Sequence, residues 1–161
     1  MTNFKFTQEN LKRIESEVKK YPVKQPAVMA ALWIGQEQNG WISGEVIKEV
    51  ASVLDMTSED VLGIVSFYTM YHQKPMGKYH IQVCTNVSCM LRGGYEIFDQ
   101  IKEKFNIDNM QVTEDNLFSL EEVECMGSCG TAPMIAVNED YFENLDREKV
   151  EQIVNSLKEK S

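Results

Sequence analysis

The four cysteines of this 161-residue chain fall into two pairs whose spacing is typical of a metal site. Cys84 and Cys89 are separated by four residues, Cys125 and Cys129 by three, and thirty-five residues lie between the pairs. Gaps of two to four residues suit a four-thiolate zinc site. A [2Fe–2S] cluster binds two thiolates on each iron, so two pairs also satisfy it. The spacing alone does not favour a zinc site over an iron–sulfur cluster or the reverse. Disulfides are a third alternative, less expected for a chain of this size.

The residues around the cysteines favour the iron–sulfur alternative. A methionine follows one cysteine of each pair, Met90 and Met126, and we expect these apolar neighbours to limit water around the site. Low exposure and N–H···S hydrogen bonds shift a cluster's potential, whereas structural zinc has no potential to tune. Gly127 and Gly130 let backbone N–H groups approach a buried anion. The competing interpretation is that both methionines only fill the core.

The second half of the chain is expected to position the cysteines with strands and helices. Residues Tyr79 to Cys84 alternate in polarity, with Ile81 and Val83 on one face, which predicts a half-buried strand. Phe118 to Cys125 and Pro133 to Val137 are further strand candidates. In the first of these the alternation breaks at Glu121–Glu122, which suggests a β-bulge. Each cysteine pair is then expected where a strand ends and a loop begins.

Helical periodicity is present on both sides of these strands. Helical spacing of apolar residues predicts one helix through Ile97, Ile101 and Phe105, and Asp146 can cap a last helix. In the first half, four short helices are expected, with starts marked by Thr7, Pro26, Ser43 and Thr57. The predicted fold class is α+β: a small helical bundle followed by an α/β domain.

The charge of the chain is uneven. Residues 1–77 contain 8 Lys or Arg and 9 Asp or Glu, whereas residues 78–161 contain 8 and 16, and the net charge of the whole chain is −9. This asymmetry suggests a domain boundary near Gly77 and so predicts two domains, 1–77 and 78–161. The competing interpretation is that the acidic surface only keeps the protein in solution. Because the chain has no basic patch, nucleic acid is not an expected partner.

No segment is expected to enter a membrane. The most apolar stretch, Val61 to Tyr71, is shorter than the roughly 20 residues that a spanning helix requires. The first residues lack the features of a signal peptide, so the protein is expected to be cytoplasmic. His72 and His80 are candidate metal ligands by residue type, but four cysteines already complete a site, so neither is expected to bind a metal.

Two segments carry a resemblance to a known family, the E subunit of NADH-quinone oxidoreductase (respiratory complex I). They are VLGIVSFYTMYHQKPMGKYHIQVCTNVSCMLRGG (Val61 to Gly94) and CMGSCGTAPMIAVN (Cys125 to Asn138). The helical first half, with QNGWIS at Gln38 to Ser43, also looks like the family's N-terminal region. The chain is also similar to the equivalent subunits of NAD-linked hydrogenases and formate dehydrogenases.

The resemblance implies a thioredoxin-like second domain in which Cys84, Cys89, Cys125 and Cys129 hold one [2Fe–2S] cluster. It also implies docking, largely through the N-terminal helices, onto a flavoprotein subunit that binds FMN and NADH. As part of such a complex the chain would be peripheral on the cytoplasmic side of the inner membrane. Its function would be electron transfer.

No nucleotide site is expected in this chain itself, because no G-x-G-x-x-G follows a strand. Two alternatives stay open beside the leading function. One is the equivalent subunit of an NAD-reducing hydrogenase or a formate dehydrogenase, and the other is a zinc-stabilised interaction module with no redox role.

Overall fold

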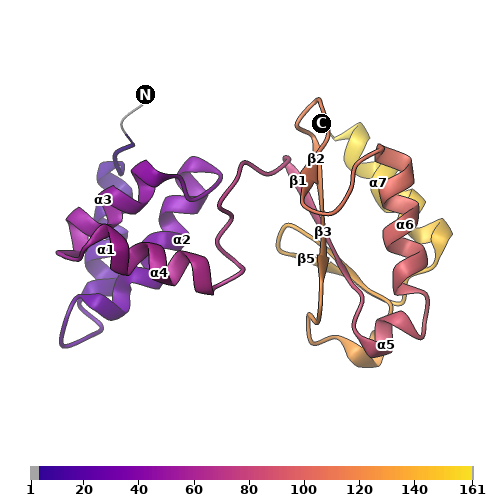
Figure 1. The fold of residues 1–161 in the computed structure, drawn as a ribbon, viewed down its shortest axis with the longest axis horizontal. Helices are drawn as coiled ribbons and strands as arrows, with labels where there is room; N and C mark the ends of the chain where they lie inside the picture. Colours follow the sequence, from indigo (N-terminus) through magenta and orange to yellow (C-terminus); the bar gives the residue numbers. More distant parts are fainter. Residues whose placement is uncertain (1–3, 161) are drawn as a thin grey trace. The chain divides into compact units, whose positions relative to one another are not determined.

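The computed structural model describes residues 4–160, which belong to two compact units, residues 1–75 and 76–161 (Figure 1). The helical unit contains the following helices: α1 (Gln8–Val18), η1 (Gln25–Ala27, a 3₁₀ helix), α2 (Val28–Asn39), α3 (Gly44–Leu54) and α4 (Ser58–Phe67). The prediction of a small bundle of four helices is confirmed.

Local sequence signals fix where these helices begin. The side chains of Thr7, Ser43 and Thr57 each accept a hydrogen bond from a backbone N–H in the first turn of α1, α3 and α4. The Thr57 hydroxyl also donates to the Asp60 carboxylate at 2.6 Å. Such capping satisfies N–H groups that have no partner inside the helix. Helix α2 ends at Gly40, whose φ of 82° is readily adopted only by glycine.

The helical unit has its own hydrophobic core. Residues from all four α-helices are buried in it, among them Ile14, Leu32, Val50 and Val61. The first described residues are also tied down, because the backbone N–H of Thr7 donates to the side chain of Gln38 at 3.1 Å.

The second unit is a five-stranded sheet with helices. Its elements are β1 (Tyr79–Cys84), α5 (Val87–Met90), α6 (Gly94–Phe105), β2 (Gln111–Val112), β3 (Phe118–Val123), η2 (Cys129–Thr131, a 3₁₀ helix), β4 (Ile135–Val137), β5 (Asp140–Phe142) and α7 (Arg147–Glu159). The strand order is β2-β3-β1-β4-β5, in which β1 and β3 are parallel and the other neighbours are antiparallel. The helix predicted after Asp146 is α7, and the Asp146 side chain caps it.

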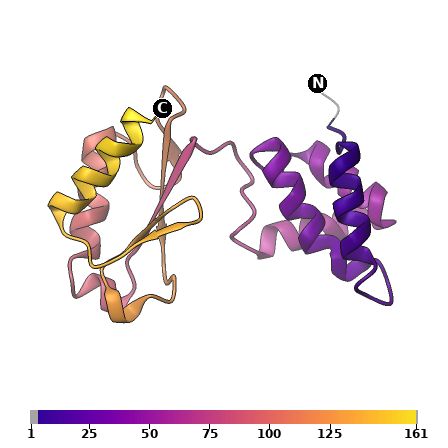
Figure 2. The same ribbon diagram turned by 180° about the vertical axis from the view of Figure 1, so that it is seen from behind.

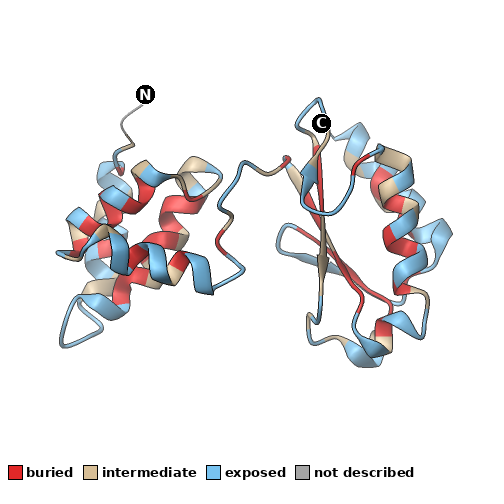
Figure 3. Ribbon diagram, in the orientation of Figure 1, coloured by how far each residue is buried: buried red, intermediate tan, exposed pale blue. Residues whose placement is uncertain are grey.

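Helices α6 and α7 cover one face of the sheet (Figures 1 and 2). Ile81 and Val83 of β1 point to this face and pack with Ile101 of α6 and Val154 of α7. Buried positions accordingly gather along the strands and on the sides of the helices that face them (Figure 3). Strand β1 is the central strand, and its last residue, Cys84, lies at the end of the sheet where β1 stops.

Two expectations about the strands are wrong. The ladder between β1 and β3 runs without interruption from Tyr79–Phe118 to Cys84–Val123, so β3 has no bulge against β1. The glutamates that break the alternation are both hydrogen bonded: Gln82 Nε2 donates to Glu121 at 2.8 Å, and Thr85 Oγ1 donates to Glu122 at 2.8 Å. Strand β1 is also more than half-buried, because His80 and Cys84 on its other face are buried as well.

The short edge strands β2 and β5 were not expected from the sequence. Both lie at the borders of the sheet and contain two and three residues. Across the described residues, no helix is long and apolar enough to span a bilayer.

Candidate iron–sulfur site

The two cysteine pairs come together because β1 and β3 are parallel neighbours. Cys84 is the last residue of β1 and pairs with Val123, the last residue of β3, two positions before Cys125. The carboxyl ends of parallel strands meet at the same edge of a sheet, so both loops leave from one place. The prediction that each pair begins where a strand ends is confirmed, although Cys89 lies in the short helix α5.

The four thiols are free, and their environments differ by pair. Cys84 and Cys89 are buried, with exposed fractions of 3% and 2%, whereas Cys125 and Cys129 are exposed. The buried pair packs with Ala132 and Met134 in a small apolar cluster. Cys84 and Cys89 therefore form a buried inner pair, and Cys125 and Cys129 lie on an outer loop at the surface.

Burial controls the chemistry of the inner pair. It raises the pKa of the Cys89 thiol to about 11, and a hydrogen bond with Cys84 acts in the same direction. A backbone hydrogen bond with Met134 acts against this rise. Since metal ligands are thiolates, binding at Cys89 must release a proton, and a metal supplies the positive charge that makes this favourable.

Backbone groups hold the outer loop in a conformation suited to an anionic sulfur. The N–H of Gly127 donates to the Sγ of Cys125 at 3.4 Å, and the φ of Gly127 is 81°. This hydrogen bond is of the type expected from the glycines of this loop. The hydroxyl of Tyr141, on β5, donates to the carbonyl of Met126 at 3.2 Å, which ties the loop to the sheet. The Ala132–Pro133 peptide bond after the loop is cis.

Gly94 is a residue of the site that no sequence pattern identified. A Cβ on Gly94 would stand 2.8 Å from the carbonyl oxygen of Cys84 and 3.0 Å from the carbonyl carbon and oxygen of Cys89. Helix α6 can begin this close to both cysteines only because Gly94 has no side chain. The sequence signal that could have found it is the Gly93–Gly94 pair, which follows the first two cysteines by a few residues.

Only one of the two methionines that follow a cysteine lies as expected. Met126 is partly buried against the apolar cluster of the inner pair, as predicted. Met90 is 44% exposed, so the expectation that it shields the site from water is wrong. Because α5 is a single turn on the surface, the side chain after the buried Cys89 points outward.

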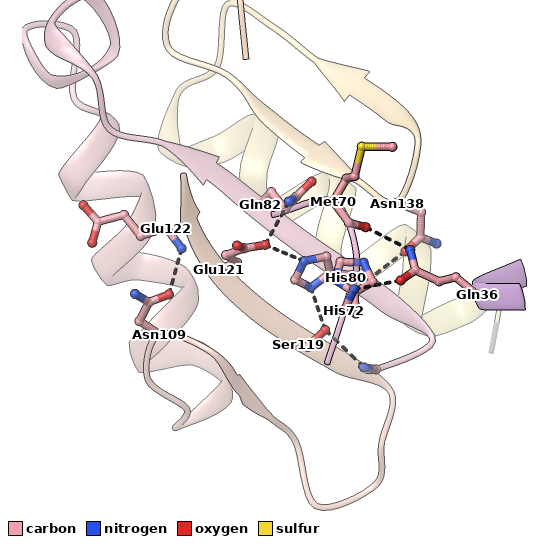
Figure 4. A network of polar contacts seen from close by, with 11 residues as sticks. Gln36, Met70, His72, His80, Gln82, Asn109, Ser119, Glu121, Glu122 and Asn138 are labelled. Atoms are coloured by element: carbon pink, nitrogen blue, oxygen red, sulfur yellow. Dashed lines mark hydrogen bonds and ion pairs between the residues drawn. The ribbon is translucent and has the colours of Figure 1, made fainter. Parts of the chain in front are cut away.

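His80 belongs to a separate polar network on the sheet face opposite α6 and α7 (Figure 4). Its Nδ1 lies 2.9 Å from the Ser119 hydroxyl and its Nε2 lies 2.9 Å from the Glu121 carboxylate. The Ser119 hydroxyl also accepts the N–H of Gly77 at 3.1 Å. Both ring nitrogens of His80 are therefore engaged away from the cysteines. His72 belongs to the helical unit, where its backbone N–H donates to Gln36 at 2.7 Å.

The donor set fits a two-iron cluster. Both cysteine pairs lie at the end of the sheet where β1 and β3 stop. One pair is buried, and the other is exposed on a loop with an N–H···S hydrogen bond. Pairs of thiolates, one pair for each of two irons, are what a [2Fe–2S] cluster requires.

Comparisons with known proteins agree with this donor chemistry. The sequence model of the thioredoxin-like [2Fe–2S] ferredoxins matches residues 14–158. The E subunit of the NADH-quinone oxidoreductase of Rickettsia bellii is 44% identical over 161 aligned residues, which cover 98% of this chain and 96% of the relative. The NADH-quinone oxidoreductase subunit 2 of Thermus thermophilus is 41% identical, over 90% of this chain and 82% of the relative.

A solved structure shares the fold. A chain of an NAD⁺-reducing [NiFe]-hydrogenase in the H₂-reduced state superposes with a TM-score of 0.74 at 19% identity. The match covers 84% of this chain and 23% of the hydrogenase chain. The likeness in fold agrees with the predicted fold class, and the sequence matches confirm the predicted family. The chain is a member of the thioredoxin-like [2Fe–2S] ferredoxin family, with close to full-length relatives among the E subunits of NADH-quinone oxidoreductases.

Proposed function

We propose that this chain is the electron-transfer subunit of an NADH:quinone oxidoreductase and that Cys84, Cys89, Cys125 and Cys129 hold its one [2Fe–2S] cluster. The observation that carries the proposal is the meeting of two cysteine pairs at the edge where the parallel strands β1 and β3 end. Family membership and the names of the nearly full-length relatives support it.

In this proposal the two cysteine pairs hold the cluster from two sides, one buried and one exposed. Cys84 and Cys89, buried in the apolar cluster, would hold the [2Fe–2S] cluster on its side away from water. Cys125 and Cys129 are exposed and would hold it on the side that faces a partner subunit. The bound cluster supplies one-electron redox chemistry, and burial and N–H···S hydrogen bonds set its potential.

The partner in this proposal is a flavoprotein subunit that carries FMN and oxidises NADH. The isolated chain is expected to bind no NADH and to catalyse no reaction, since its part is to accept and pass on electrons. Isothermal titration of the purified chain with NADH tests this, and measurable binding would contradict it. The complex would lie at the cytoplasmic side of the inner membrane with this subunit peripheral, and release of the subunit by mild salt or chaotrope would support that location.

The decisive experiment is metal and sulfide analysis of anaerobically purified protein, combined with EPR of the reduced state. Two irons and two acid-labile sulfides per chain, a brown colour and an EPR signal after one-electron reduction are expected. A colourless protein with one zinc and no EPR signal would instead establish a zinc-stabilised interaction module.

The fold shared with a chain of an NAD⁺-reducing hydrogenase favours one second candidate, the equivalent subunit of such an enzyme. Both candidates use the same cluster, so spectroscopy of this chain does not separate them. Affinity purification from the native host does: quinone-reductase subunits support the leading proposal, and a [NiFe] subunit supports the second.

A further inference from the structure

The carboxylate of Glu143 accepts hydrogen bonds from the turn that carries Cys129. The Thr131 hydroxyl donates to Glu143 Oε1 at 2.7 Å, and the Ser128 hydroxyl is hydrogen bonded to the same oxygen. The two hydroxyl oxygens lie 2.7 Å from each other. Cys129 lies between these residues in the sequence, so Glu143 holds the turn on both sides of the cysteine. A backbone hydrogen bond adds to this tie, since the N–H of Asn144 donates to the carbonyl of Thr131 at 2.7 Å.

The strand register places Glu143 at the cysteine end of the sheet. Phe142, the last residue of β5, pairs with Ile135 at the start of β4, close to the Cys129 turn. Glu139 belongs to the turn at the other end of the same hairpin, next to the pair formed by Val137 and Asp140. The two glutamates are both exposed and carry the same charge, but only Glu143 contacts the cysteine-bearing turn.

The carboxylate affects the site in two ways. An ionised carboxylate can only accept hydrogen bonds, so it draws the hydroxyl protons of Ser128 and Thr131 toward itself. Those protons are then not directed at the sulfur of Cys129. The carboxylate also adds a negative charge beside a centre that becomes more negative on reduction, which disfavours the reduced form.

We propose that Glu143 is a positioning residue that fixes the Cys129 turn and lowers the reduction potential of the cluster. This inference rests on the proposed function, because it requires a cluster on Cys129. Neutralising Glu143 should increase the equilibrium ratio of reduced to oxidised cluster by roughly threefold to tenfold. For a one-electron couple this is a rise in the midpoint potential of about 30 to 59 mV.

The test is an EPR-monitored redox titration of the full-length, cluster-loaded protein. Glu143→Gln keeps the size of the side chain and removes its charge, and its midpoint potential should rise. Glu139→Gln removes the same charge at the far end of the hairpin and should leave the potential at the wild-type value. Glu143→Asp retains a carboxylate and should restore a potential close to wild type.

Each outcome is decisive. An unchanged potential in Glu143→Gln, or equal rises in Glu143→Gln and Glu139→Gln, would overturn the inference. If Glu143→Gln cannot hold a cluster, Glu143→Asp decides: a retained cluster at the wild-type potential supports the role of the carboxylate, and a lost cluster refutes it. The wild-type protein separates the two proposals, because missing iron and sulfide there would remove the proposed function itself.

Discussion

Gly94 lies directly against the carbonyl oxygen of Cys84: a Cβ on this glycine would stand 2.8 Å from that oxygen. The same Cβ would meet the carbonyl group of Cys89 at 3.0 Å. All these atoms belong to the backbone, so no side-chain rotation can make room. The first turn of α6 and the segment from Cys84 to Cys89 are therefore packed directly against each other.

Gly94→Ala should weaken the cluster unit. The added methyl group must displace the backbone near Cys84 and Cys89, and overpacking of this kind costs about 1–3 kcal/mol. We expect a lower urea midpoint for the cluster unit and fewer irons per chain. Ser156→Ala, at an exposed position in α7 of the same unit, is the control and should leave both quantities unchanged. Equal effects of the two substitutions would show that the close approach at Gly94 is unimportant.

Removing a single thiolate should remove or destabilise the cluster. Replacing Cys89 or Cys129 with Ala leaves three thiolates for two tetrahedral irons, which need two each. The visible absorption and the EPR signal of the reduced protein should be lost or should decay rapidly. Val87→Ala, at an exposed position in the same short helix as Cys89, should keep both signals. An unchanged spectrum in either cysteine variant would refute the ligand assignment.

The thiols of the cluster-free protein should react unequally. The pKa of Cys89 is raised to about 11 from 9.0. At neutral or mildly alkaline pH, the thiolate fraction of Cys89 is therefore about a hundredfold smaller than that of a cysteine with an unshifted pKa. Timed alkylation with iodoacetamide and peptide mass spectrometry should label the exposed Cys125 and Cys129 first. Labelling of Cys89 should accelerate as the pH rises toward 11. Equal labelling rates at pH 8 would contradict the buried position of the inner pair.

The sequence was most informative where a single residue determines local structure. Thr7, Ser43, Thr57 and Asp146 are N-caps as predicted, because capping depends on one side chain and the next three N–H groups. The paired cysteines likewise lie, as predicted, where two strands end. In contrast, β2 and β5 are too short to show alternation, and each exists because a neighbouring strand, β3 or β4, offers backbone hydrogen bonds.

Features that depend on contacts distant in sequence were missed. The close approach of Gly94 and the hydrogen bonds of Glu143 each join segments that no local pattern connects. The two adjacent glutamates, Glu121 and Glu122, break the alternation and so suggested a bulge. They fit a regular strand because their hydrogen-bond partners, Gln82 and Thr85, lie on another segment of the chain. Periodicity predicts which residues share a face, but it cannot predict which polar groups satisfy one another across strands.

Ser119→Ala should destabilise the cluster unit through the His80 network. Ser119 is 1% exposed, and its hydroxyl accepts the N–H of Gly77 and lies 2.9 Å from His80 Nδ1. Its removal leaves a buried donor without its partner, which costs about 1–3 kcal/mol. The free energy of unfolding in urea measures the loss. Ser156→Ala, at an exposed position in α7, should be close to neutral, and equal losses would contradict the importance of the network.

The two units should fold separately, with the cluster confined to the second. The core of the helical unit is built from residues between Phe4 and Tyr71, and both apolar clusters of the second unit from residues between Tyr79 and Leu157. Since no described core is shared, a fragment of residues 76–161 should retain its secondary structure by circular dichroism. It should also bind the same iron and sulfide as the full chain.

Assembly should distinguish that fragment from the full chain. The helical unit is expected to provide much of the surface that docks on the flavoprotein partner, so its removal should weaken co-purification while leaving the cluster's EPR signal in place. The full-length chain with Cys129→Ala is the complementary control, because it keeps the helices and loses the cluster. If the fragment co-purified with the partner as well as the full chain does, docking would have to be assigned to the cluster unit instead.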